Sequence, residues 1–169
     1  MIVLQTSRLV LREFTPADAA FVLRLLNEPS FIENIGDRKV RTPDDAVRYL
    51  TDGPIASYQR RGHGLWRVEL AETQQPIGMC GLLKRDQLAD IDVGYAFLPE
   101  FWSKGYAREA VEETLEFARR LGRPRVVAIV SPGNAASVRL LEKLGFAAEG
   151  RTRLTPDASE VDVYALPLA

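Results

Sequence analysis

The spacing of apolar residues divides the chain into segments of two kinds. Trp66, Val68 and Leu70 alternate with polar residues, and this period of two predicts a β-strand over 65–71. Val126 to Val130 is a continuous apolar run, which is typical of a strand buried on both faces. By the same criteria we expect strands over 8–14, 65–71, 77–83, 89–98, 126–130, 146–153 and 160–168.

Helical spacing is clearest between Gly105 and Leu121, where apolar residues recur every three or four positions. A second helix is expected over 134–144, because the glycine that follows it suits the left-handed residue at a helix C-terminus. Thr15 and Thr42 each precede a proline and an acidic residue, a pattern typical of helix N-termini. A further short helix is expected over 55–61.

The order of these elements predicts a mixed α/β fold. The three strands between residues 65 and 98 follow one another closely, which predicts an antiparallel meander. The helix over 105–121 then leads to the buried strand 126–130, as in a crossover between parallel strands. The chain contains no repeat, linker or low-complexity segment, and we expect one domain over 1–169.

The composition argues against several classes of protein. The 22 Lys and Arg residues nearly balance the 23 Asp and Glu residues, so the net charge of -1 gives no general attraction to nucleic acid or to an anionic membrane. A single cysteine, Cys80, and a single histidine, His63, argue against a disulfide framework and a Cys- or His-rich metal site. We expect no metal, no nucleic-acid partner and no membrane partner. The N-terminus lacks the pattern of a signal peptide, and a cytoplasmic location is expected.

The segment from Leu98 to Arg108 has the composition of an anion-binding loop. A predicted strand ends there, a short loop containing Lys104 and Gly105 follows, and the longest helix begins. The first amides of a helix lack internal partners and lie at the positive end of its dipole, so this junction suits a diphosphate. Gly105 allows the backbone to approach a ligand, and Lys104 and Arg108 add positive charge. An ordinary strand–helix turn is the alternative explanation.

A second informative segment follows the buried strand. Asn134 is a favourable helix N-cap, and Ser137 lies in the first turn behind it. Plain helix capping explains Asn134 equally well. The chain contains no Walker sequence, no dinucleotide fingerprint and no serine-hydrolase motif.

Together the two segments resemble those of the GNAT superfamily of acetyl-CoA-dependent N-acetyltransferases. The phosphate loop of that family reads Q/R-x-x-G-x-G/A, and this chain has Trp102-Ser-Lys-Gly105-Tyr-Ala107, with Trp102 in place of the leading Gln or Arg. Asn134-x-x-Ser137, followed by Glu142-Lys-Leu-Gly-Phe146, is similar to the family's second motif. The opening Thr6-Ser-Arg8-Leu-Val-Leu-Arg12 resembles the RimJ/RimL-like branch, whose best-known members acetylate the N-termini of ribosomal proteins. The resemblance covers nearly the whole chain.

The resemblance implies a twisted, mostly antiparallel sheet with helices on both faces. It also implies that the central strands 89–98 and 126–130 run parallel and splay apart at one end. Acetyl-CoA is then the co-substrate, with its pantetheine arm in the gap. The residues implied in binding it are Phe97, Leu98, Trp102, Ser103, Lys104, Gly105, Tyr106, Ala107, Arg108 and Asn134.

The implied chemistry is direct attack of a neutral amine on the thioester in a ternary complex. A strand amide near Leu98 is expected to stabilise the oxyanion. Leu141 occupies the position where many family members have a tyrosine acid, so Ser137 becomes the candidate for hydrogen bonding to the leaving thiolate. The catalytic set expected is Ser137, Asn134 and, as general base, Glu69. Glu69 is expected on the strand face opposite Trp66, Val68 and Leu70, pointing into the cleft.

The identity of the base stays open at this point. Asp92, His63 and a chain of water molecules are alternatives to Glu69, and each carboxylate is equally explained as a solvated strand charge. Tyr95 and Tyr106 are expected to be packing residues.

The acceptor is expected to be an amine bound between the segments 27–64 and 152–160. The resemblance favours an α-amino group, on a peptide N-terminus or a small molecule. A catalytically weak acyl-CoA sensor of the same fold is the alternative function. The sequence leaves the acyl chain length open, and it fits a monomer or a homodimer.

Overall fold

The computed structural model describes residues 1–168, and these residues contain one sheet of eight strands. The strand order is β1-β2-β3-β4-β5-β6-β8-β7, with every neighbouring pair antiparallel except β5 and β6. The fold is therefore the mixed α/β architecture predicted, and the meander of β3, β4 and β5 is confirmed. The strands are β1 (Ile2–Gln5), β2 (Leu9–Arg12), β3 (Leu65–Leu70), β4 (Pro76–Leu83), β5 (Asp92–Phe97), β6 (Arg125–Val130), β7 (Ala147–Thr152) and β8 (Val161–Pro167).

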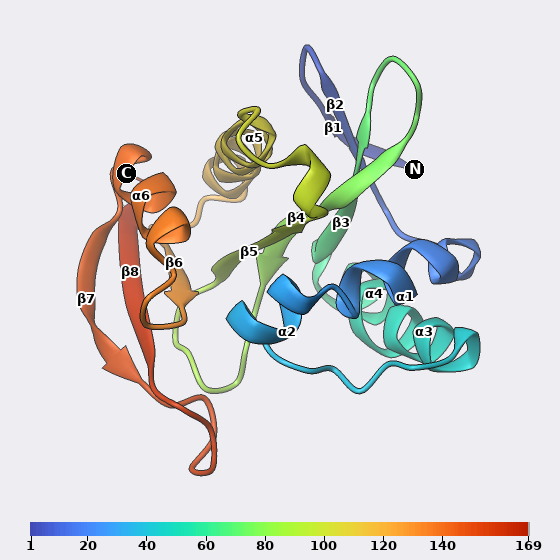
Figure 1. Cartoon of the computed structure of the whole chain (residues 1–169). Coiled ribbons are helices and arrows are strands. Elements are labelled where there is room, and N and C mark those ends of the chain that lie inside the picture. Colours follow the sequence, from blue (N-terminus) through green and yellow to red (C-terminus); the bar gives the residue numbers. More distant parts are fainter. Residues whose placement is uncertain (169) are drawn as a thin grey trace.

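Helices cover both faces of this sheet. Figure 1 shows α5 and α6 on one side, and α1 to α4 gathered on the other. Short 3-10 turns precede α1 and follow β5, and a π-helical turn joins α3 to α4. The helices are α1 (Ala19–Leu26), α2 (Pro29–Asn34), α3 (Pro43–Leu50), α4 (Ala56–Arg61), α5 (Tyr106–Arg120) and α6 (Ala135–Lys143).

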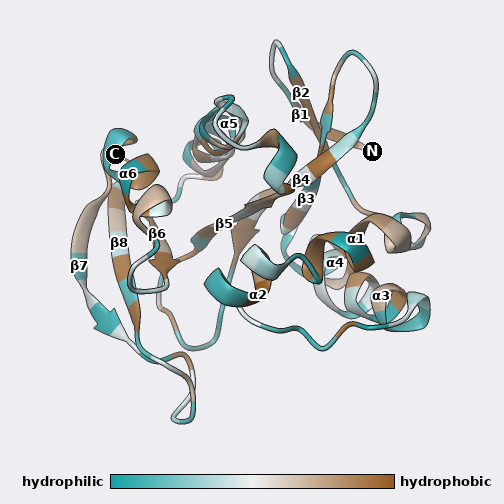
Figure 2. Cartoon of the chain, in the orientation of Figure 1, coloured by the Kyte–Doolittle hydropathy of each residue, from teal (hydrophilic) through white to brown (hydrophobic). Residues whose placement is uncertain are grey.

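The alternation of side chains along the strands separates two apolar cores. Trp66 and Val68 pack in the core beneath α5, where the Trp66 ring meets Phe117 edge-on with the centroids 5.0 Å apart. Leu65, the neighbour of Trp66, lies in the other core with the apolar residues of α1, α2 and α3. Figure 2 shows this arrangement as apolar colour concentrated on the central strands and on the helix faces that cover them.

The two parallel strands separate soon after they meet. The register joins Asp92 of β5 to Val127 of β6, and the Val127 amide donates to the Ile91 carbonyl at 3.0 Å. From there β6 stays paired with β8, whereas β5 continues along β4 to Phe97. The splay predicted between these strands is therefore confirmed, and it opens toward their C-terminal ends.

Several elements differ from the predictions. The strands β1 and β2 form a hairpin of which only the second strand was expected, because β1 has four residues that do not alternate clearly. Helix α2 was missed because its six residues carry no helical periodicity long enough to read. Strand β5 begins at Asp92 rather than at residue 89. Across the residues that the structure describes, no helix is both long enough and apolar enough to cross a membrane.

Candidate active site

A cavity of about 1400 Å³ opens where β5 and β6 diverge. Its wall combines β5, β6, the N-terminus of α5, α6 and the segment from α2 to α4. Of the residues expected at the site, Leu98, Lys104 and Glu69 lie outside this wall. The expected residues that line it are Phe97, Trp102, Ser103, Gly105, Tyr106, Ala107, Arg108, Asn134 and Ser137.

The loop before α5 has the backbone of an anion-binding turn. Gly105 is the N-cap residue with φ +82°, and Ser103 has φ +60°. Both positive angles belong to the tight turn in front of a helix of 15 residues, whose first amides have no partner within the helix. The Trp102 indole N–H donates to the Phe97 carbonyl at 2.9 Å, which fixes the ring against the end of β5.

Arg8 completes this loop from a distant part of the chain. Its guanidinium lies 4.5 Å from the centre of the Tyr106 ring and donates to the Lys104 carbonyl at 3.0 Å. Glu109, in the first turn of α5, holds Arg8 through an ion pair of 2.8 Å and also accepts a hydrogen bond from Thr6. Thr6 and Arg8 belong to the N-terminal sequence motif, which by itself gave them no place at the site.

A strand amide near Leu98 was expected to face the thioester, but the amide of Leu98 itself does not face the gap. That amide donates to the Ile77 carbonyl at 2.9 Å, and Leu98 is buried in the core. The main-chain N–H and C=O groups of successive residues point to opposite sides of a strand. Because those of Leu98 point toward β4, the N–H and C=O groups of Phe97 and Tyr95 point away from β4 and toward the gap. The Phe97 carbonyl is taken by Trp102, which leaves the Phe97 amide facing the cavity.

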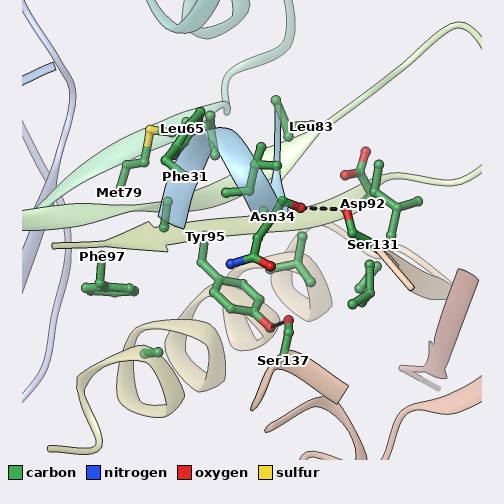
Figure 3. Close-up of a pocket in the computed structure, with 18 of the residues that line it drawn as sticks. Phe31, Asn34, Leu65, Met79, Leu83, Asp92, Tyr95, Phe97, Ser131 and Ser137 are labelled. Carbon is green, nitrogen blue, oxygen red and sulfur yellow. Dashed lines mark hydrogen bonds between the residues drawn. The ribbon is translucent and has the colours of Figure 1, made fainter. Parts of the chain in front are cut away.

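Helix α6 presents Ser137 to the same cavity. The Asn134 side chain accepts a hydrogen bond from the Ser137 amide at 3.3 Å, so Asn134 caps the helix as well as lining the wall. The Ser137 hydroxyl lies 2.5 Å from the phenol oxygen of Tyr95. In Figure 3 the Tyr95 ring extends from β5 across the gap to Ser137. Tyr95 packs against the core as expected, and its hydroxyl in addition contacts Ser137.

The expectation that Glu69 points into the cleft is wrong. Glu69 does lie on the predicted face of β3, but its carboxylate binds Arg12 at 3.3 Å and Arg67 at 2.8 Å. Asp18 joins the same cluster, with 2.8 Å to Arg12 and 2.7 Å to Arg67. Glu69 is 7% exposed, and its charge is matched within this cluster rather than presented to a substrate.

Asp92 is the buried carboxylate that lines the cavity. It is 1% exposed, and the Arg85 side chain donates to it at 3.2 Å. Burial raises the pKa of Asp92, and the charge of Arg85 opposes that rise. His63 lies outside the wall with its Nδ1 3.1 Å from the Leu82 carbonyl, and burial lowers its pKa. Within residues 1–168, no three His, Cys, Asp or Glu side chains group as metal ligands would.

The other end of the cavity lies against α2, α3 and α4, which belong to the segment 27–64 where the acceptor is expected to bind. Phe31, Asn34, Tyr49 and Leu154 are among its lining residues. The Ser131 hydroxyl donates to the Asn34 carbonyl at 2.6 Å, which joins α2 to the end of β6 (Figure 3). Both residues line the cavity.

Comparisons with known proteins agree with one another. The acetyltransferase (GNAT) domain family matches residues 8–147. The uncharacterized N-acetyltransferase YoaA of Bacillus subtilis (strain 168) is 31% identical over 155 residues, which cover 89% of this chain and 86% of YoaA. An acetyltransferase structure from Agrobacterium tumefaciens str. C58 is 25% identical, with a TM-score of 0.80 over 98% of this chain and 94% of that one. RimL, the ribosomal L7/L12 alpha-N-protein acetyltransferase in complex with coenzyme A, shares the fold with a TM-score of 0.83 at 18% identity, over 99% of this chain and 98% of RimL.

Proposed function

Because the chain belongs to the GNAT family of acetyltransferases, we propose that it transfers the acetyl group of acetyl-CoA to an α-amino group of a peptide or small molecule. The observation that carries the proposal is a single cavity that joins an anion-binding helix N-terminus to the Ser137 hydroxyl. One domain over 1–169 is part of the proposal, because strands outside the matched range 8–147 belong to the same sheet.

The diphosphate of acetyl-CoA binds at the loop before α5. The amides from Ser103 to Arg108 supply hydrogen-bond donors there, and the helix dipole adds positive potential. Arg8 supplies a further positive charge beside Gly105. The Trp102 indole, anchored to β5, forms the wall beside the pantetheine arm in place of the family's Gln or Arg. Asn134 lines the cavity near the thioester end.

The two substrates meet in the gap between β5 and β6. The amine enters from the face of α1 to α4, where Asp92 lies, and attacks the thioester carbonyl. The Phe97 amide, which the strand register turns toward the gap, stabilises the oxyanion. Asp92 accepts the proton that the amine loses, and the Ser137 hydroxyl donates a hydrogen bond to the departing thiolate.

The acceptor class follows from the protonation of amines. An α-amino group has an unperturbed pKa of about 7.7–8.0, so a large fraction is neutral at about pH 7.5. A lysine side chain with a pKa near 10.4 needs about 4 kcal/mol to reach the neutral form at that pH. The positive charge of Arg85 balances the negative charge of the buried Asp92 carboxylate, so Asp92 is only a modest base. A modest base favours an α-amino acceptor, because an α-amine loses its proton more readily than a lysine side chain. The likeness of fold to RimL supports the same choice.

A matched pair of peptides tests the acceptor class. One peptide has a free N-terminus and no lysine, and the other has a blocked N-terminus and one lysine, in an otherwise equal sequence. We expect acetyl transfer from acetyl-CoA to the first peptide, measured by mass spectrometry and by release of free CoA. Preferential transfer to the blocked peptide would overturn the α-amino proposal and leave the family assignment unchanged.

A further inference from the structure

The contact between Tyr95 and Ser137 spans the gap where acetyl transfer is proposed to occur. Tyr95 comes from β5, Ser137 comes from the first turn of α6, and both line the cavity. Their oxygen atoms are 2.5 Å apart, and Figure 3 shows the ring reaching across the gap. A buried tyrosine hydroxyl usually needs a hydrogen-bond partner, and the hydroxyl of Ser137 supplies it here from the opposite wall of the cavity.

The chemistry of the two hydroxyls decides which one donates. Each carries one proton and can accept in return. A phenol is the better donor and the poorer acceptor, because its oxygen lone pair is delocalised into the ring. The phenol of Tyr95 therefore donates to the Ser137 oxygen. Ser137 then keeps its own proton for a partner in the cavity.

We propose that Tyr95 is the positioning residue of Ser137, holding the serine proton toward the sulfur that leaves during acetyl transfer. This inference rests on the proposed function. In the step concerned, the amine nitrogen bonds to the carbonyl carbon, the carbon–sulfur bond breaks, and the sulfur leaves with the electron pair. The thiolate accepts the Ser137 hydrogen bond and later takes a proton from solvent, in exchange for the one the amine lost. Tyr95 keeps its proton throughout.

Orientation, rather than proton transfer, is what the tyrosine can supply. Burial raises the pKa of Tyr95 to about 12. A thiol has a pKa near 8.5, so full transfer from this phenol to a thiolate is unfavourable by roughly three-thousandfold. The nearby Cys80 thiol is also neutral, because burial raises its pKa to about 12. With Cys80 neutral and its own pKa raised, Tyr95 stays protonated and remains the donor to Ser137.

The arrangement also accounts for Leu141. Many family members have a tyrosine at this position of α6, whereas Leu141 is fully buried in the core beneath the sheet. In this chain the phenol instead comes from the opposite wall of the gap, from β5. It reaches the sulfur through Ser137 rather than directly.

A double-mutant cycle tests the inference. We expect Tyr95→Phe to lower kcat about tenfold, as for a hydrogen bond that acts on a charged group, with the Kd of acetyl-CoA changed less than about twofold. Ser137→Ala lowers kcat at least as much. Adding Tyr95→Phe to Ser137→Ala then changes kcat no further. An equal loss in both backgrounds, or an unchanged kcat in Tyr95→Phe, overturns the proposal.

A second measurement needs no acceptor. Ultraviolet absorbance follows ionisation of the CoA thiol bound to the protein, and both variants should raise the pKa of that thiol to the same value. An unchanged thiol pKa in Tyr95→Phe contradicts the positioning role, whereas a wild-type protein that transfers no acetyl group contradicts the proposed function. Tyr58→Phe is the matched control. Tyr58 does not line the cavity, and its buried hydroxyl donates to the main-chain carbonyl of Leu65, so the variant should lower stability and leave kcat unchanged.

Discussion

Arg8 and Glu109 lie 101 residues apart in the chain, and their ion pair of 2.8 Å joins the β1–β2 hairpin to the first turn of α5. Burial opposes ionisation of Glu109, but its bonds to Thr6 and Arg8 hold its pKa below the usual value. A charged Glu109 keeps the Arg8 guanidinium beside the loop that faces the diphosphate. The N-terminal hairpin is therefore part of the proposed cofactor site.

We expect Arg8→Ala to weaken acetyl-CoA binding roughly fivefold, because about 1 kcal/mol of electrostatic attraction at a helix N-terminus is lost. Calorimetry at low and high salt measures the effect, which should shrink as salt screens the charge. Arg151→Ala is the control, since it removes an equal charge from an exposed pair with Asp162 on the far strands. Equal losses of affinity in both variants would contradict a local role for Arg8.

Two glycines at opposite ends of α5 provide a test of the phosphate loop. Gly105 and Gly122 both have positive φ, +82° and +75°, so alanine strains the backbone at either position. We expect both variants to lose about 1 kcal/mol of stability. Only Gly105→Ala should also weaken acetyl-CoA binding, by about tenfold, because its new methyl group lies 3.3 Å from Arg8 in front of the loop. If Gly105→Ala binds acetyl-CoA as the wild type does, the loop assignment is wrong.

The sequence predicted those parts of the site that depend on local signals. Gly105 before a long helix and Asn134 before a shorter one are residue types favoured at helix N-caps, and both line the cavity. Glu69 was misjudged for a non-local reason. Its strand face was predicted correctly, but the position of β3 in the sheet and the approach of Arg12 and Arg67 depend on pairings across the whole chain.

Tyr95 was missed for a related reason. Nothing in the sequence distinguishes a tyrosine that packs from one that reaches across a gap to another element. The gap itself exists because β5 and β6 diverge after Asp92 and Val127, and that divergence follows from pairing with different neighbours. Helix α2, which lines the proposed acceptor end through Asn34, has only six residues and gives no periodic signal.

The ion pairs of Asp18 with Arg12 and Arg67 are expected to affect the stability of the protein and not its catalysis. Burial opposes ionisation of Asp18, but its bonds to Arg12, Thr15 and Arg67 lower its pKa below 3.8. A carboxyl with a lowered pKa stabilises the fold above its unfolded pKa, and this contribution disappears as pH falls through the folded value. We expect Asp18→Asn to lower the free energy of unfolding by about 3 kcal/mol at pH 7, because two arginines lose a buried partner.

Urea denaturation from about pH 7 down to pH 2 measures this contribution. The difference in stability between the wild type and Asp18→Asn should be constant at neutral pH and shrink below about pH 4. Asp37→Asn is the control, because its pair with Arg41 is exposed and should contribute little. A difference that stays constant down to pH 2 would show that Asp18 does not act through its charge.

The last prediction separates the two carboxylates that compete for the role of base. Glu69→Gln disturbs the cluster with Arg12 and Arg67, so it should lower stability while kcat changes less than about twofold. Asp92→Asn removes a carboxylate inside the cavity and should lower kcat at least about tenfold.

The pH dependence of the rate separates the two carboxylates further. Rates are compared at equal concentrations of neutral amine, so that the titration of the amine itself does not contribute. The wild-type rate should then fall as pH drops through the pKa of Asp92, which burial places above 3.8, and Asp92→Asn should lack that fall. If Glu69→Gln loses the acidic limb and Asp92→Asn keeps it, the base lies in the arginine cluster after all, and the substrate must reach β3.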